Sequence, residues 1–207
     1  NAMEVINGGK LSYPRTNVPM PGLVGGPCLE KDPHILSQSL EAKGINLEIT
    51  QAARLVNERQ PDETVEFIKE RLKSVVRGGV PKITLAGIAF KGIPATDDLR
   101  GSMALKVLNS IRKYIPKAKI SIYDPVCNPD QLKVEGVHAD HYGDTLLDAI
   151  KESHCLIITN NHADLGSIHP VEIYEMLSPG GFIYDYWNHF SDRKAINSDN
   201  FYYGVGN

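Results

Sequence analysis

The feature that most constrains this fold is the alternation of apolar runs with amphipathic segments after residue 82. Residues 83–90, ITLAGIAF, form one continuous apolar run, as expected of a strand that is buried on both faces. Further strands are expected over residues 119–123, 155–159, 182–185 and 201–205, and helices over residues 102–115, 144–151 and 170–177. This alternation predicts an α/β fold with a Rossmann-like, mostly parallel sheet and helices on both of its faces.

A helical region is expected to precede the sheet. The pattern predicts one helix over residues 46–58 and a second that begins at Pro61 and ends before Gly78. Together these helices carry more apolar surface than one small sheet domain can cover, which favours a homodimer that forms through them. We therefore expect two domains, over residues 3–78 and 79–207. Residues 4–31 are rich in Gly, Pro and Asn and are expected to be mostly loop.

The candidate chemistry lies in residues 20–33, MPGLVGGPCLEKDP. Gly25 and Gly26 would let a ligand approach the backbone closely. Asp32 followed by proline is typical of a helix start, with Asp32 as N-cap of a helix over residues 34–43. Cys28 would then lie near the positive end of a helix, which favours the thiolate, and Asp32 could hold or activate a water molecule. The alternative is an inert cysteine beside an ordinary helix cap.

The same stretch resembles the catalytic-cysteine loop of the nucleotide-sugar 6-dehydrogenases, the UDP-glucose/GDP-mannose dehydrogenase family. That loop reads roughly Gly-Gly-x-Cys-x-x-Lys-Asp, and Cys28, Lys31 and Asp32 match it. Residues 85–100 independently match a second family pattern, with LAGIAFK followed by TDDLR. The weaker match YDP follows at residues 123–125. Two separated motifs in the family's order make the resemblance specific.

The resemblance implies an NAD-dependent enzyme of polysaccharide biosynthesis that oxidises the C6 alcohol of a UDP- or GDP-sugar to a carboxylate. Cys28 would be the nucleophile, passing through a thiohemiacetal and a thioester, and Asp32 the general base. Arg15 would reach the substrate across a dimer interface. The resemblance further implies substrate contacts for Leu23, Gly25, Gly26 and Lys91, and cofactor contacts for Lys31 and Arg100.

The sequence also departs from the family pattern. It has no N-terminal NAD-binding domain and no helix with the family's catalytic lysine and asparagine, so NAD would be bound mainly outside this chain. The end of the first strand carries no Gly-x-Gly-x-x-Gly, which favours a nucleotide-sugar domain over a dinucleotide domain. Gly101 stands where the family has glutamate, and Trp187 where it has arginine. Trp187 would offer a stacking face or cover the sheet edge.

Other interpretations stay open. The chain could be a non-catalytic module that binds a nucleotide sugar or a partner chain, or part of a hydroxy-acid dehydrogenase, which would not need Cys28. Lys91 could be a solvated lysine at a loop tip. Arg100 could pair with Asp97 or Asp98 instead of a cofactor phosphate.

Composition excludes several classes of function. The net charge of −3 over 207 residues lacks the excess of positive charge that is typical of proteins that bind nucleic acid or an anionic membrane. Three cysteines far apart in sequence indicate neither a disulfide framework nor a zinc site, and Cys127 and Cys155 are expected to be structural. His138 and His141 lack further ligands nearby, so we expect no metal. A reducing cytoplasm fits a catalytic thiol, and no apolar run is long enough to span a bilayer.

Overall fold

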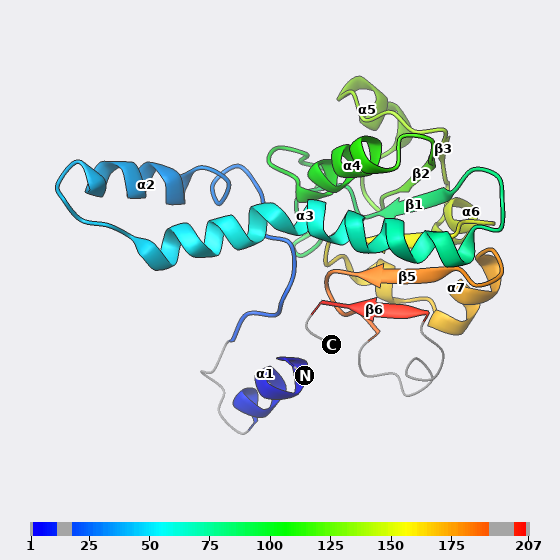
Figure 1. Ribbon diagram of the computed structural model, residues 1–207, viewed down its shortest axis with the longest axis horizontal. Helices are drawn as coiled ribbons and strands as arrows, with labels where there is room; N and C mark the ends of the chain where they lie inside the picture. Colours follow the sequence, from blue (N-terminus) through cyan, green and yellow to red (C-terminus); the bar gives the residue numbers. More distant parts are fainter. Residues whose placement is uncertain (1, 12–17, 191–200, 206–207) are drawn as a thin grey trace.

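The computed structural model describes residues 2–11, 18–190 and 201–205 of the chain (Figure 1). Its centre is a six-stranded sheet in the order β3-β2-β1-β4-β5-β6, and every neighbouring pair is parallel. The strands are β1 (Lys82–Ala86), β2 (Lys119–Tyr123), β3 (His141–Tyr142), β4 (Cys155–Ile158), β5 (Phe182–Asp185) and β6 (Tyr202–Gly204). The predicted α/β fold with a parallel sheet is therefore confirmed.

The structure describes seven α-helices and one 3-10 helix, and most of them pack on the two faces of the sheet. They are α1 (Ala2–Lys10), α2 (Asp32–Glu41), α3 (Glu48–Val75), α4 (Met103–Tyr114), α5 (Pro129–Val134), α6 (Leu146–Ile150) and α7 (Pro170–Met176), with the short 3-10 helix η1 (Ala163–Gly166). One core joins α3, α4 and α5 to one face of the sheet, and a second core joins α6, α7 and η1 to the other. In β4, Ile157 faces the first core while Leu156 and Ile158 face the second, because successive strand side chains alternate.

The strand order reverses between β1 and β4. From β1 the chain proceeds outward to β2 and β3, then returns to place β4 on the other side of β1. In open parallel sheets, ligands bind beyond the carboxyl ends of the strands at such a switch point. A ligand site is therefore expected at the loops that follow β1 and β4.

The prediction that Pro61 starts a second helix was wrong. One helix, α3, runs for 28 residues through a buried Pro61. An internal proline loses one backbone hydrogen bond and costs about 3 kcal/mol. The second half of α3 offsets this by burying Val65, Ile68 and Leu72, each at most 4% exposed, in the first core.

Smaller differences have local causes. The first strand ends at Ala86 and not at residue 90, because Gly87 turns the backbone with φ +89°. Helix α1 lies in the stretch expected to be loop, and α5, η1 and the two-residue β3 were not predicted. These elements are too short or too polar to show a clear periodicity.

The α2 helix and the first half of α3 extend away from the sheet (Figure 1). They expose several large apolar side chains, among them Ile35, Leu36, Ile49, Leu55 and Val56, which are between 50% and 87% exposed. This is the surface on which the expected homodimer depends, and the dimer stays a prediction. Across the described ranges, no helix is both long and apolar enough to cross a membrane.

Candidate active site at the carboxyl edge of the sheet

The loop after β1 is joined to the loop after β4. Gly87 packs so closely that a Cβ on it would lie 2.5 Å from the side-chain oxygen of Asn160. The side-chain oxygen of Asn161 accepts a hydrogen bond from the Gly92 amide at 2.8 Å. These contacts fix the backbone on both sides of Lys91, so Lys91 lies at the switch point of the sheet, where a ligand phosphate is expected.

The backbone amides at the end of β1 are already occupied. One carboxylate oxygen of Asp124 accepts from the amides of Ile88 and Ala89, and the other accepts from Val126 and Cys127 at 2.8 and 2.9 Å. In a dinucleotide-binding domain, amides at this place receive the pyrophosphate. Here an internal carboxylate takes that place, so the loop has no free cradle for the NAD pyrophosphate.

The cysteine loop lies directly on the sheet domain. The Gly26 amide donates to the Gly101 carbonyl at 2.9 Å, and a Cβ on Gly26, whose φ is +99°, would lie 2.6 Å from the Phe90 ring. A Cβ on Gly25 would lie 2.4 Å from the same Gly101 carbonyl oxygen. Both glycines are thus required by packing within the protein. Their predicted contact with substrate stays a prediction.

The segment just before these glycines is buried. The Leu23 side chain is 3% exposed and belongs to the first core, so a substrate contact at Leu23 would have to come from its backbone. Farther along the loop, Glu30 forms an ion pair with Lys106 of α4 at 2.9 Å. The loop is therefore attached to the domain on both sides of Cys28.

Cys28 lies in a turn that leads into α2, and its thiol is exposed. Its carbonyl accepts from the amides of Lys31 and Asp32 at 3.1 and 2.9 Å, which places Asp32 one helical turn after the cysteine. The prediction that Asp32 is the N-cap was wrong. Lys31 is the N-cap and makes no side-chain capping bond, whereas Asp32 is the first helical residue and pairs with the Lys31 ammonium at 2.5 Å.

Charged groups gather near the thiol. The hydrogen bond to Asp32 raises the pKa of Lys31, and the negative charge available at Cys28 adds to this. A two-point hydrogen bond to Asp98, with nitrogen–oxygen distances of 3.0 and 2.7 Å, raises the pKa of Arg100, and Cys28 contributes there too. The same contact with Arg100 lowers the pKa of Asp98, with a smaller contribution from Lys91. Asp32 and Asp98 thus hold Lys31 and Arg100, two of the predicted binding cations, in local ion pairs.

Of the predicted site residues, Arg15 lies outside the described part of the chain. Arg100 makes the local pair that was one of its two interpretations, and its contact with a cofactor stays a prediction. Lys91 holds its ammonium 5.1 Å from the Phe90 ring centroid. Trp187 follows β5, and its indole nitrogen donates to the Thr159 carbonyl at 3.1 Å.

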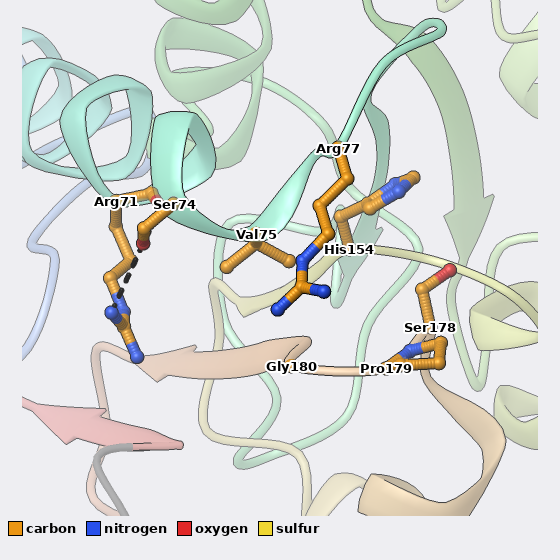
Figure 2. A pocket seen from close by; sticks show the side chains of 8 residues that line it. All are labelled: Arg71, Ser74, Val75, Arg77, His154, Ser178, Pro179 and Gly180. Atoms are coloured by element: carbon orange, nitrogen blue, oxygen red, sulfur yellow. Dashed lines mark hydrogen bonds between the residues drawn. The ribbon is translucent and has the colours of Figure 1, made fainter.

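Two large hollows lie at opposite edges of the sheet. One, of about 560 Å³, is lined by residues 96–100 together with Leu105, Gln131 and Glu135, and so adjoins the site. The other, of about 540 Å³, contains Arg71 and Arg77 with His154 and Gly180 (Figure 2). His154 and Gly180 precede β4 and β5, which places this hollow at the amino edge. The C-terminal end of α3 also lies there, and positively charged side chains are favourable near its partial negative charge.

Solved structures with the same arrangement are nucleotide-sugar dehydrogenases. The UDP-D-ManNAc dehydrogenase from Pyrococcus horikoshii superposes on all of this chain with a TM-score of 0.76 and 28% identity, and the match covers 44% of that protein. A UDP-glucose dehydrogenase from Pyrobaculum islandicum, at 23% identity and the same TM-score, shows the shared fold. The fold and the cysteine loop therefore place the chain in this structural class.

Sequence comparison identifies the family. The model for the UDP-binding domain of the UDP-glucose/GDP-mannose dehydrogenase family matches residues 84–192, and the model for its central domain matches residues 1–59. This chain belongs to that family. The UDP-N-acetyl-D-mannosamine dehydrogenases of Pyrococcus horikoshii and Methanococcus vannielii are 32% and 30% identical over 81% and 85% of the chain. The chain spans only 35% and 36% of those relatives.

Proposed function

We propose that this chain is the cysteine-bearing, nucleotide-sugar-binding part of an NAD-dependent nucleotide-sugar 6-dehydrogenase. The observation that carries the proposal is the position of Cys28. Its thiol is exposed on a loop attached to the carboxyl edge of a parallel sheet, one helical turn before Asp32. A thiol at a ligand-binding edge suits covalent capture of a carbonyl carbon.

The substrate class follows from the family and from the cations. The UDP-binding domain model and relatives named as UDP-sugar dehydrogenases support a uridine nucleotide sugar. Lys91, at the switch point, would contact the diphosphate as a point charge. Arg15 would add a contact from a partner subunit in a homodimer.

The reaction divides between this chain and a cofactor held elsewhere. Because Asp124 occupies the amides after β1, the described residues do not fit the NAD pyrophosphate, and both hydride transfers are assigned to a site outside this chain. What this chain supplies is covalent chemistry. Lys31 and Arg100 would contribute charge toward a bound cofactor.

The first oxidation leaves an aldehyde at C6. The Cys28 thiolate adds to that carbon, a sulfur–carbon bond forms, and the carbonyl oxygen takes a proton to give a thiohemiacetal. Loss of a hydride from C6 to the cofactor bound outside this chain, and of the hydroxyl proton to solvent, would convert this adduct to a thioester. A water molecule then attacks the thioester while the Asp32 carboxylate takes one of its protons. The sulfur–carbon bond breaks, the thiolate leaves, and the acid loses its proton to solvent to give the carboxylate.

Capture of an aldehyde tests this role without any cofactor. The chain would be incubated with the 6-aldehyde of a UDP-sugar, with the corresponding alcohol, or with buffer, and then treated with iodoacetamide and analysed by mass spectrometry. We expect the aldehyde to protect Cys28 and the alcohol to protect it less. In Cys28→Ser, the labelling of Cys127 and Cys155 should be the same under all three conditions. Equal labelling under all three conditions would contradict the proposal.

A second measurement tests the division of labour. The chain alone should form no NADH from NAD+ and any nucleotide sugar, because hydride transfer needs the nicotinamide held close to C6 and loss of that positioning costs about 7 to 11 kcal/mol. Addition of an NAD-binding domain should restore NADH formation, and Cys28→Ala should then stop the reaction before the acid. NADH formation by the chain alone would contradict the assignment.

The absence of an NAD cradle among the described residues also favours one alternative, a non-catalytic module that binds a nucleotide sugar. UDP or UDP-sugars would raise the melting temperature of that module, since a ligand that binds the native state stabilises the native state. It would differ from the proposed enzyme part in showing no protection of Cys28 by the aldehyde.

A further inference from the structure

Two side chains hold the start of the cysteine loop from opposite sides. Asn57 of α3 accepts from the Val24 amide at 2.9 Å and donates to the Val24 carbonyl at 2.8 Å. Its amide group thus satisfies both backbone polar groups of one loop residue, as a neighbouring strand would. A side-chain amide can do this because it carries an acceptor oxygen and a donor nitrogen side by side.

Trp187 makes the second attachment. A Cβ on Gly22 would lie 2.7 Å from the indole ring, so the face of Trp187 packs directly on the Gly22 backbone. The position of Trp187 is itself fixed by two hydrogen bonds. The indole nitrogen donates to the Thr159 carbonyl at 3.1 Å, and the Trp187 backbone amide donates to the Asp185 carboxylate at 2.9 Å. Asp185 is fully buried at the end of β5, so the tryptophan is anchored to the sheet.

Leu23 lies between the two attachments. With its side chain 3% exposed in the first core, three consecutive loop residues are held by Trp187, by the core and by Asn57 in turn. Cys28 follows only four residues after Val24. Groups on α3 and after β5 therefore fix the start of the loop, in addition to the contacts of Gly25, Gly26 and Glu30 nearer the thiol.

We propose that Asn57 and Trp187 are positioning residues that fix the cysteine loop on the sheet and thereby determine how Cys28 meets a bound substrate. The consequence for substrate capture rests on the proposed function, whereas the attachment of the loop does not. Loss of Asn57 or Trp187 is expected to lower nucleotide affinity less than covalent capture. Lys91, the predicted diphosphate contact, belongs to the loop after β1, and only the predicted substrate contacts at Leu23, Gly25 and Gly26 lie in the displaced loop. Loss of either positioning residue should lower covalent capture, since displacement of a reacting group by about 1 Å can cost about 100-fold.

The first measurement is amide hydrogen exchange of the 207-residue chain. Asn57→Asp keeps the size of the side chain but loses the donor and sets a carboxylate against the Val24 carbonyl. We expect exchange in residues 20–27 to rise at least tenfold, with the rest of α3 and the sheet unchanged. Lys69→Ala, at an exposed position of the same helix, is the matched control. Unchanged exchange in Asn57→Asp would overturn the proposal.

The second measurement uses fluorescence, because Trp187 is the only tryptophan in the sequence. Gly22→Ala would place a methyl group where the indole lies, so the ring and the loop must separate. We expect acrylamide quenching of Trp187 to increase in Gly22→Ala and in Asn57→Asp, but not in Lys69→Ala. Quenching identical to that of the unmodified chain in both loop variants would show that the ring does not hold the loop.

The third measurement separates positioning from general stability. UDP affinity and aldehyde protection of Cys28 are compared in Asn57→Asp, Trp187→Phe and Trp187→Ala. A positioning role predicts UDP affinity within about threefold and capture lowered roughly 10- to 100-fold, with Trp187→Phe intermediate because it keeps a ring. Equal losses in both readouts would overturn the positioning role. If the unmodified chain captures no aldehyde, the proposed function fails, and exchange and quenching still test the attachment.

Discussion

Alkylation of the three cysteines should distinguish them sharply. Cys28 is exposed, whereas Cys127 and Cys155 are buried, as the sequence predicted for structural cysteines. Burial raises the pKa of the Cys127 thiol to about 12, with the nearby Asp124 carboxylate adding to the effect, and burial raises the pKa of Cys155 well above its ordinary value. Only the thiolate reacts with iodoacetamide, so burial and protonation both protect these two residues.

The expected ratio follows from the ionised fractions. At pH 8, a thiol with a pKa of about 12 is ionised in about one molecule in 10⁴, whereas a free cysteine with a pKa of about 8.5 is ionised in about one in four. Cys127 should therefore react about 10³-fold more slowly than free cysteine from ionisation alone. If the start of α2 activates Cys28, its labelling should at least equal that of free cysteine between pH 6 and 8. Labelling of Cys28 as slow as that of Cys127 would refute the activated thiol.

Three further outcomes are expected. Ile68→Ala, at a fully buried position that joins α3 to the sheet, should lower the free energy of unfolding by about 2 to 5 kcal/mol in urea titrations, whereas Lys69→Ala should change it by less than about 0.5 kcal/mol. Hydrogen bonds led by Ser110 lower the pKa of Asp62, so its contribution is present above a pH of about 4 and is lost as the pH falls through the lowered value. Because Asp62 is 44% exposed, Asp62→Asn should remove at most about 1 kcal/mol of that pH dependence, which urea titrations between pH 2 and 6 would measure. Sedimentation at micromolar concentration should show a dimer, and Ile49→Glu should dissociate it, because Ile49 is 87% exposed on the projecting part of α3; a clean monomer without the substitution would contradict this.

Most of the sheet could be predicted because the strands are recognisable as apolar runs in the local sequence. The strands over Lys119–Tyr123 and Phe182–Asp185 were predicted with the bounds that the structure shows. Both are short apolar runs between turn residues, a pattern that depends little on distant contacts. The uninterrupted passage of α3 through Pro61 was not predictable in this way, since it depends on burial against a sheet formed later in the chain.

The site was predictable only as far as it is local. Cys28, Lys31 and Asp32 stand within one turn, and their spacing in sequence fixes their spacing in space. Asn57 contacts the loop across 33 residues and Asp124 contacts the amides after β1 across 36. The neighbours of Asn57 and Asp124 in the sequence do not indicate which backbone groups these side chains bind, so only the folded chain shows the contacts.

Gly101 and Trp187, the two positions that depart from the family pattern, both contact residues 22–26 of the cysteine loop. Gly101 has φ +64°, and a Cβ on it would lie 2.8 Å from the Gly26 carbonyl oxygen, while Trp187 covers Gly22. Gly101→Glu and Trp187→Arg should therefore each displace the loop. A loop already displaced by one change loses little more by the second, so the double variant should destabilise the chain by about 0.5 to 3 kcal/mol less than the sum of the single changes. Urea titrations of the three variants give this coupling, and additivity within about 0.5 kcal/mol would show that the two departures act independently.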